Sequence, residues 1–168
     1  MGNKWATIVM KKIYCLLMLI LFINSANAQY VDLGLPSRTL WKESNEEGFY
    51  THRDAVSEFG ATLPTKEQYM ELIDVCKWKW QDGGFIVVGP NRNSIFFPAK
   101  GAYNSGGYID TVYGYSGYYW TVAVNNLKMG WYIKFIESAK PVIMNGGLDT
   151  DNSDFFCPVR LVKLNTNL

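Results

Sequence analysis

Apolar and polar residues alternate with two different periods along this chain. A period of two, bounded by Gly-, Pro- and Asn-containing turns, is typical of half-buried β-strands. The pattern breaks at Gly34-Leu35-Pro36-Ser37 and again at Asp82-Gly83-Gly84, which predicts turns between neighbouring strands. The predicted strands cover residues 30–33, 38–41, 77–80, 85–88, 94–97, 131–136 and 158–164.

A helical period replaces this alternation over residues 51–76. Thr51 can cap a first helix, with Asp54 in the first turn and Gly60 just beyond the end. Thr65 opens a capping box for a second helix. One stripe of that helix has the i, i+3, i+4, i+7 spacing of a buried face: Tyr69, Leu72, Ile73 and Cys76.

Two later segments lack either period. Residues 101–119 are rich in Gly, Tyr and Ser, which predicts a long ordered loop held to the core by its aromatic rings. Residues 145–154 are polar and rich in turn formers. The order of strands, two helices, then strands and long loops predicts an α+β fold and not an alternating βαβ fold.

The N-terminal segment has the three parts of a secretory signal peptide. Lys11 and Lys12 form a basic region, residues 13–23 form an apolar core, and Ala26-Asn27-Ala28 supplies a small-x-small cleavage pattern. The alternative is a membrane anchor, which we disfavour because the apolar run is short for a bilayer span.

Residues 1–28 are therefore predicted to be removed, with Met10 as an alternative natural start. The mature chain, residues 29–168, has the length of a single domain. We expect an exported protein, located outside the cell, on its surface or in the periplasm, with no transmembrane span in the mature chain.

Removal of this leader changes the charge and the cysteine count. The whole chain carries 16 basic and 15 acidic residues, and the leader takes three lysines with it, which leaves a net charge near −2. A weakly acidic domain has no electrostatic basis for binding nucleic acid. Cys76 and Cys157 remain, either as a disulfide in an oxidising compartment or as two separate buried thiols.

Sequence motifs for catalysis or metal binding are largely missing. His52 is the only histidine, and its place at a helix start predicts a solvated side chain. Asp149, Asp151 and Asp154 form an acidic cluster without the central Gly and terminal Glu of an EF-hand loop. No zinc spacing, nucleophile elbow or phosphate loop is present. We therefore expect no cofactor, no metal and no catalytic residue.

Tyrosine and asparagine are concentrated in the C-terminal half. Tyr and Asn beside Gly suit an adaptable recognition surface, although such aromatic rings can also simply anchor loops. For Trp120 and Trp131 we favour anchoring. The candidate ligand-binding residues are Tyr113, Tyr115, Tyr118, Asn125, Asn126, Tyr132, Asn145, Asp149 and Asp151.

Five ordered blocks of the mature chain carry a family signature. They are Val31 to Ser37 with Thr39 to Trp41, Ala61 to Glu67 with Glu71 to Ile73, Cys76 to Trp80, Gly89 to Asn91 with Asn93 to Ala99 and Gly101, and Tyr118 to Thr121 with Val159-Arg160. Together these blocks resemble the Fibrobacter succinogenes major paralogous domain family. They cover nearly the whole mature chain, although the segment between Trp41 and Thr51 is much shorter than is usual.

That family looks related to the C-type lectin-like fold. The resemblance implies two helices packed on small antiparallel sheets, long ordered loops and paired terminal strands, with residues 30–33 near residues 159–162. The Glu-Pro-Asn, Gln-Pro-Asp and Trp-Asn-Asp motifs of calcium-dependent lectins do not occur here. Residues 125–154 lie where variable proteins of diversity-generating retroelements, which use this fold, carry their varied residues.

The fold hosts binding modules, adhesins and formylglycine-generating enzymes, so it does not fix the activity. We expect a non-catalytic binding or adhesion module that recognises a glycan or a protein on another surface through its C-terminal loops. The alternatives are a structural subunit of an envelope assembly and an enzyme of the formylglycine-generating type.

Overall fold

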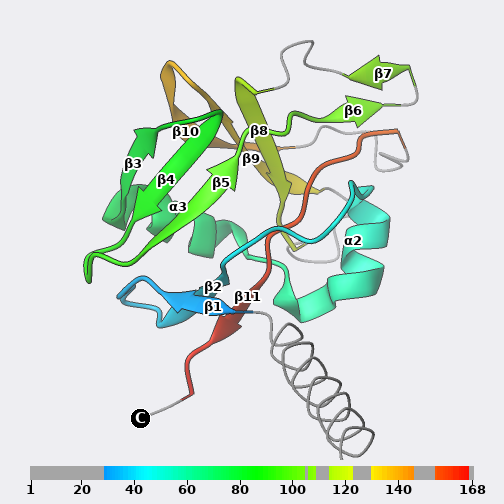
Figure 1. The fold of residues 1–168 in the computed structure, drawn as a ribbon. Coiled ribbons are helices and arrows are strands. Elements are labelled where there is room, and N and C mark those ends of the chain that lie inside the picture. The colour runs from blue at the N-terminus through cyan, green and yellow to red at the C-terminus, as the bar shows by residue number, and fades with distance from the viewer. Residues whose placement is uncertain (1–28, 105, 109–113, 123–129, 146–153, 167–168) are drawn as a thin grey trace, which may run out of the picture.

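The computed structural model describes residues 29–104, 106–108, 114–122, 130–145 and 154–166 (Figure 1). Over these residues the chain is a mixed α+β fold in which two helices pack with small antiparallel sheets. The predicted signal peptide lies outside the described residues. No helix in the described part of the chain is long and apolar enough to cross a membrane.

The first and last strands share one sheet. The order is β1 (Tyr30–Asp32), β2 (Thr39–Lys42) and β11 (Val162–Leu164), with β2 in the centre. The expectation that the terminal strands pair is wrong in detail, because both bond to β2 and not to each other. The Thr39 and Trp41 side chains of this central strand are fully buried.

The C-terminal strand is also shorter than the predicted 158–164. Before β11, the chain runs beside residues 42–50 and bonds to them at spaced positions, including one isolated antiparallel bridge between Tyr50 and Cys157, instead of forming a continuous ladder. Backbone carbonyls of Cys157, Val159 and Leu161 accept from the amides of Tyr50, Glu46 and Lys42.

Both predicted helices are confirmed, together with their caps. In α2 (His52–Phe59) the Thr51 side chain accepts from the Asp54 amide. In α3 (Lys66–Val75) Thr65 and Gln68 form the reciprocal capping box. A short 3₁₀ turn, η1 (Gly60–Thr62), joins them. The predicted stripe of α3 faces inward, with Tyr69 and Leu72 fully buried.

The second sheet lies in front of α3 in Figure 1 and has the order β3-β4-β5. Its strands are β3 (Lys77–Trp80), β4 (Gly84–Val88) and β5 (Ser94–Pro98). The predicted alternation in β3 is confirmed, because Trp78 and Trp80 are half-buried while both lysines are exposed.

The third sheet has the order β10-β9-β8 and is accompanied by a small hairpin of β6 and β7. The prediction of one long loop over residues 101–119 is wrong in two places, because β6 and β7 pair within it and β8 at its end is a strand with all five residues buried. Burial on both faces removes the polar–apolar alternation that identifies a strand. The bounds are β6 (Tyr103–Asn104), β7 (Gly107–Tyr108), β8 (Ser116–Trp120), β9 (Trp131–Ile136) and β10 (Ala139–Asn145).

Consecutive residues of the third sheet enter two separate hydrophobic clusters. Tyr119 and Phe135 join the cluster beneath the β3-β4-β5 sheet, whereas Tyr118 and Trp120 join a second cluster with α2. Cys76 belongs to the first cluster and Cys157 to the second, and both thiols are free and buried. Of the two alternatives for these cysteines, the structure therefore has two separate buried thiols and not a disulfide.

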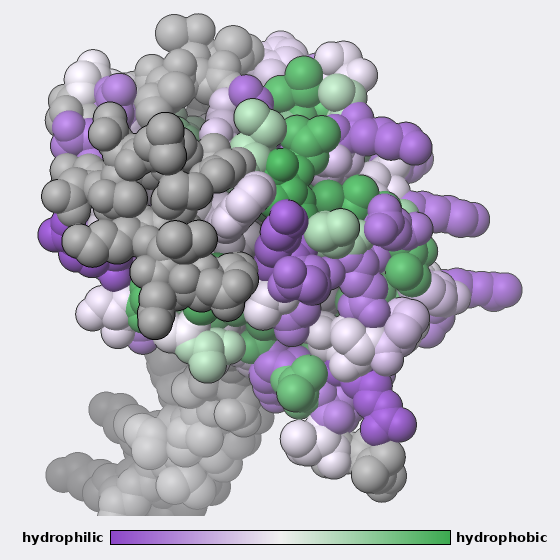
Figure 2. All heavy atoms as spheres, turned by 180° about the vertical axis from the view of Figure 1, so that it is seen from behind, coloured by the Kyte–Doolittle hydropathy of each residue, from purple (hydrophilic) through white to green (hydrophobic). Residues whose placement is uncertain are grey.

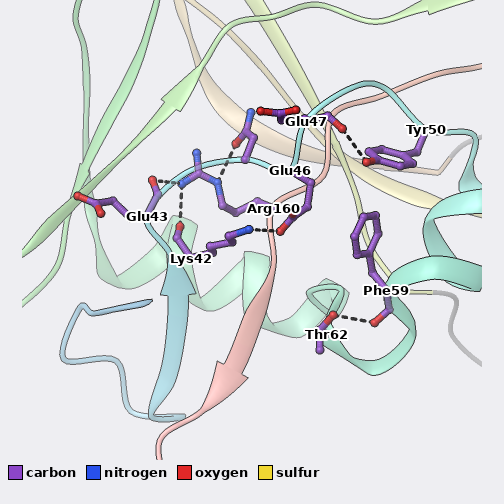
Figure 3. Close-up of polar contacts among 9 residues, drawn as sticks. Lys42, Glu43, Glu46, Glu47, Tyr50, Phe59, Thr62 and Arg160 are labelled. Atoms are coloured by element: carbon purple, nitrogen blue, oxygen red, sulfur yellow. Dashed lines mark hydrogen bonds and ion pairs between the residues drawn. The ribbon is translucent and has the colours of Figure 1, made fainter. Parts of the chain in front are cut away.

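A buried guanidinium joins the C-terminal segment to the rest of the fold (Figure 3). Arg160 is 1% exposed and donates to the carbonyls of Lys42, Glu43 and Phe96 and to the Asn45 amide oxygen, at 2.6–2.8 Å. Its guanidinium carbon also lies 4.6 Å from the centre of the Phe97 ring. No carboxylate among the described residues forms an ion pair with it, so neutral oxygens solvate the charge.

Candidate functional site

An open groove separates the β3-β4 hairpin from the turn that joins β9 to β10. We call it the aromatic groove. Its volume is about 630 Å³, within the range of small-molecule sites. The C-terminal end of α3 closes one side. The lining residues are Ile73, Asp74, Cys76, Trp78, Trp80, Phe85, Glu137, Ser138, Ala139, Lys140 and Pro141.

Two indoles in the groove are fixed by their neighbours. Trp78 stacks on Phe97 with ring centres 5.7 Å apart and donates its Nε1 hydrogen to the Leu72 carbonyl at 3.0 Å. Both Trp78 and Trp80 meet Phe85 edge to face, with centres 5.6 and 5.1 Å apart. Because Phe85 in turn packs against Phe135, the aromatic surface is preorganised.

Polar side chains border these rings. Asp74, Glu137 and Lys140 lie at the mouth of the groove and are exposed. The one ion pair found among the described residues joins Lys42 and Glu46, so these three charges do not pair with one another. Their hydrogen-bonding capacity is available to a ligand.

The Cys76 thiol in the groove is unreactive at neutral pH. Burial, with a smaller effect from the Glu71 carboxylate, raises the pKa of Cys76 to about 11. Burial also raises the pKa of Cys157 well above its ordinary value. Since the thiolate is the nucleophilic form, both cysteines act as apolar groups at neutral pH.

The structure separates the candidate residues predicted from the sequence. Tyr115 is 55% exposed, and its carbonyl accepts from the Glu137 amide, which places its backbone beside the groove. The prediction that Tyr118 belongs to a ligand-binding surface is wrong, because Tyr118 is 4% exposed and packs against Tyr132 and Phe155. Tyr113, Asn125, Asn126, Asp149 and Asp151 lie outside the described residues.

The strand register explains why the described candidates do not form one surface. Ser116 pairs with Ile136 at one end of the third sheet, whereas Trp120 pairs with Tyr132 at the other end. Asn145 pairs with Trp131 and therefore shares the end opposite Tyr115. Tyr132 is half-buried between Trp120 and Phe155 rings. The anchoring role favoured for Trp120 is confirmed by its complete burial.

His52 is not the solvated residue that the sequence predicts. It is half-buried, its Nε2 lies 3.1 Å from the Thr121 carbonyl oxygen, and its ring meets Trp120 edge to face at 5.1 Å. Gly130 is close enough that a Cβ there would lie 2.6 Å from the imidazole. Burial lowers the pKa of His52, against a smaller opposing effect of the bond to Thr121. The residue joins α2 to the third sheet.

A metal centre is not formed by the part of the chain that the structure describes. Within it, no three His, Cys, Asp or Glu side chains come together in a way that could hold an ion.

Searches for related proteins found no matching family model, no matching curated protein and no matching solved structure. The site therefore rests on its own geometry. The sequence does not predict the groove, because the alternation in residues 77–80 indicates only that both indoles face inward. The facing wall, residues 137–141, comes from a distant turn that no local pattern places there.

Proposed function

We propose that this chain is an exported, non-catalytic binding module that holds its ligand in the aromatic groove. The observation that carries the proposal is the combination of two fixed, half-buried indoles with unpaired charges at the mouth. Apolar pockets with a few convergent polar groups are the usual form of ligand sites.

A C-type lectin-like fold is part of this proposal. The sheet shared by the first and last strands supports it, as do two helices early in the chain and long connections between later strands. The loops predicted to recognise a ligand, with Asn125, Asn126, Asp149 and Asp151, remain a prediction for a second recognition surface.

The chemistry of the cysteines supports a non-catalytic role. An enzyme of the formylglycine-generating type needs an accessible cysteine pair, whereas Cys76 and Cys157 lie in different hydrophobic clusters with raised pKa values. Thiol labelling of the folded protein tests this point. We expect both cysteines to react only after denaturation, and rapid labelling of both in the native protein would favour the enzyme.

Ligand binding itself is tested by titrating the purified protein with glycan and peptide libraries while recording tryptophan fluorescence. We expect a ligand that changes the emission of the wild-type protein and loses affinity for Trp80→Ala. Lys79→Ala is the matched control, because Lys79 is an exposed neighbour on the same strand. Failure of both libraries to change the emission would contradict the proposed function.

A structural subunit is the second candidate, and exposed apolar side chains favour it. Val75 on α3 and Val142 and Met144 on β10 are each more than one third exposed. Seen from behind, where α3 and β10 lie, apolar side chains form a band bordered by hydrophilic ones (Figure 2). Light scattering after size exclusion separates the two functions: a binding module is expected to be monomeric, and a stable oligomer broken by Val142→Glu would favour the subunit.

A further inference from the structure

We infer that the aromatic groove is a calcium-independent site for a neutral oligosaccharide. This inference rests on the proposed binding function and adds the chemical class of the ligand. It concerns the groove between α3, β3-β4 and the β9-β10 turn, away from the C-terminal loops predicted from the sequence.

The floor of the groove matches one side of a sugar ring. A pyranose presents an apolar face of C–H groups, which packs against the face of an aromatic ring and benefits from its negative quadrupole. Trp78 and Trp80 supply such rings, and their contacts with Phe85 and Phe97 hold them before a ligand arrives. Little conformational entropy is then lost when the ligand binds.

The mouth of the groove matches the other side of a sugar. Hydroxyl groups both donate and accept hydrogen bonds, and the mouth offers two carboxylates as acceptors and one ammonium as a donor. Asp74 and Glu137 against Lys140 give an excess of negative charge. This charge disfavours acidic glycans and favours neutral ones.

Of the two edge strands that line the groove, β3 and β10, it is β10 that disfavours an extended peptide as the ligand. Peptides that add to a sheet edge need a regular row of backbone donors and acceptors. In β10 the register shifts between Ala139 and Val142, and Pro141 has no backbone N–H. This edge is therefore a poor template for strand addition.

A bridging calcium ion is not needed for this recognition. Hydroxyl groups can bond directly to the Asp74 and Glu137 carboxylates, and no set of three acidic or imidazole ligands surrounds the groove in the described chain. Binding should therefore persist when divalent ions are chelated.

The experiment is calorimetric titration of the purified full-length mature protein with neutral hexose and pentose oligosaccharides, a uronic-acid oligosaccharide and a peptide library, each with EDTA and with calcium. We expect a neutral oligosaccharide to bind with an affinity that changes less than about twofold between EDTA and calcium. Trp80→Ala should weaken that binding at least about tenfold, or 1.4 kcal/mol.

Glu137→Gln changes an exposed side chain and leaves both indoles of the groove in place. It should also weaken binding, because it removes an anionic acceptor. Lys79→Ala should bind like the wild-type protein. Binding that needs calcium, that prefers the acidic oligosaccharide, or that neither groove variant alters would overturn the inference. A peptide ligand lost in both variants, with no sugar bound, would overturn the glycan assignment but leave the binding function standing. Absence of every ligand would contradict both.

Discussion

Arg160 shows how one residue can hold distant segments without an ion pair. Its guanidinium bonds to oxygens of residues 42–45 and of Phe96 while 1% exposed. A buried charge of this kind is tolerated only when its donors are satisfied, and its removal leaves several carbonyls unbonded.

We predict that Arg160→Ala lowers the free energy of unfolding by about 3 kcal/mol or more. Arg160→Lys should recover little, because one ammonium cannot reach the same four oxygens. Urea unfolding of the purified variants measures both effects, with Lys79→Ala as an exposed control. A loss under about 1 kcal/mol for Arg160→Ala would show that the network contributes little.

His52 makes stability depend on pH. Its pKa is lowered in the folded protein, so the unfolded chain binds the proton more tightly. Stability is therefore fully present above the ordinary histidine pKa of about 6.5 and falls as the pH drops below it.

Because His52 is the only histidine, His52→Gln isolates this effect. Thermal unfolding between pH 7.5 and 5.5 should show a decline for the wild-type protein that is smaller in the variant. Equal declines would assign the pH dependence to other groups.

At the scale of elements, β8 depends on the absence of a side chain at Gly117. A Cβ there would lie 2.1 Å from the Phe135 ring on the paired strand. We predict that Gly117→Ala costs about 1–3 kcal/mol, because the ring must leave its packed position. In a double-mutant cycle, Phe135→Leu should offset part of that cost. Additive losses would mean that the close contact does not limit the strand.

Elements differ in how well their sequence predicts them. The caps at Thr51 and Thr65 are local, so both helices are predicted with their ends. The sequence pattern does not predict β8, because burial on both faces removes the alternation of polar and apolar residues. It does not predict β10 either, because Pro141 and a register shift interrupt that strand. The groove is hidden for a different reason, because its two walls lie about sixty residues apart in the sequence and meet only through tertiary packing.

At the scale of the whole molecule, the export proposal defines the chain that would carry the binding function. In that proposal, loss of residues 1–28 removes three lysines and leaves a weakly acidic domain. We predict that the intact mass of the exported protein corresponds to a chain beginning at Gln29. Replacement of Ala28 by a bulky residue should slow processing, because cleavage requires a small side chain. A protein that keeps residues 1–28 and stays in the cytoplasm would contradict the export proposal.

The central claim, that the aromatic groove binds the ligand, is tested most directly by the indole N–H resonances of the ¹⁵N-labelled protein. Trp78 and Trp80 line the groove, whereas Trp41 and Trp120 are fully buried elsewhere and serve as internal controls. On titration with the neutral oligosaccharide found by calorimetry, the Trp78 and Trp80 signals should shift while those of Trp41 and Trp120 stay in place. Unchanged Trp78 and Trp80 signals at saturating ligand would contradict the account.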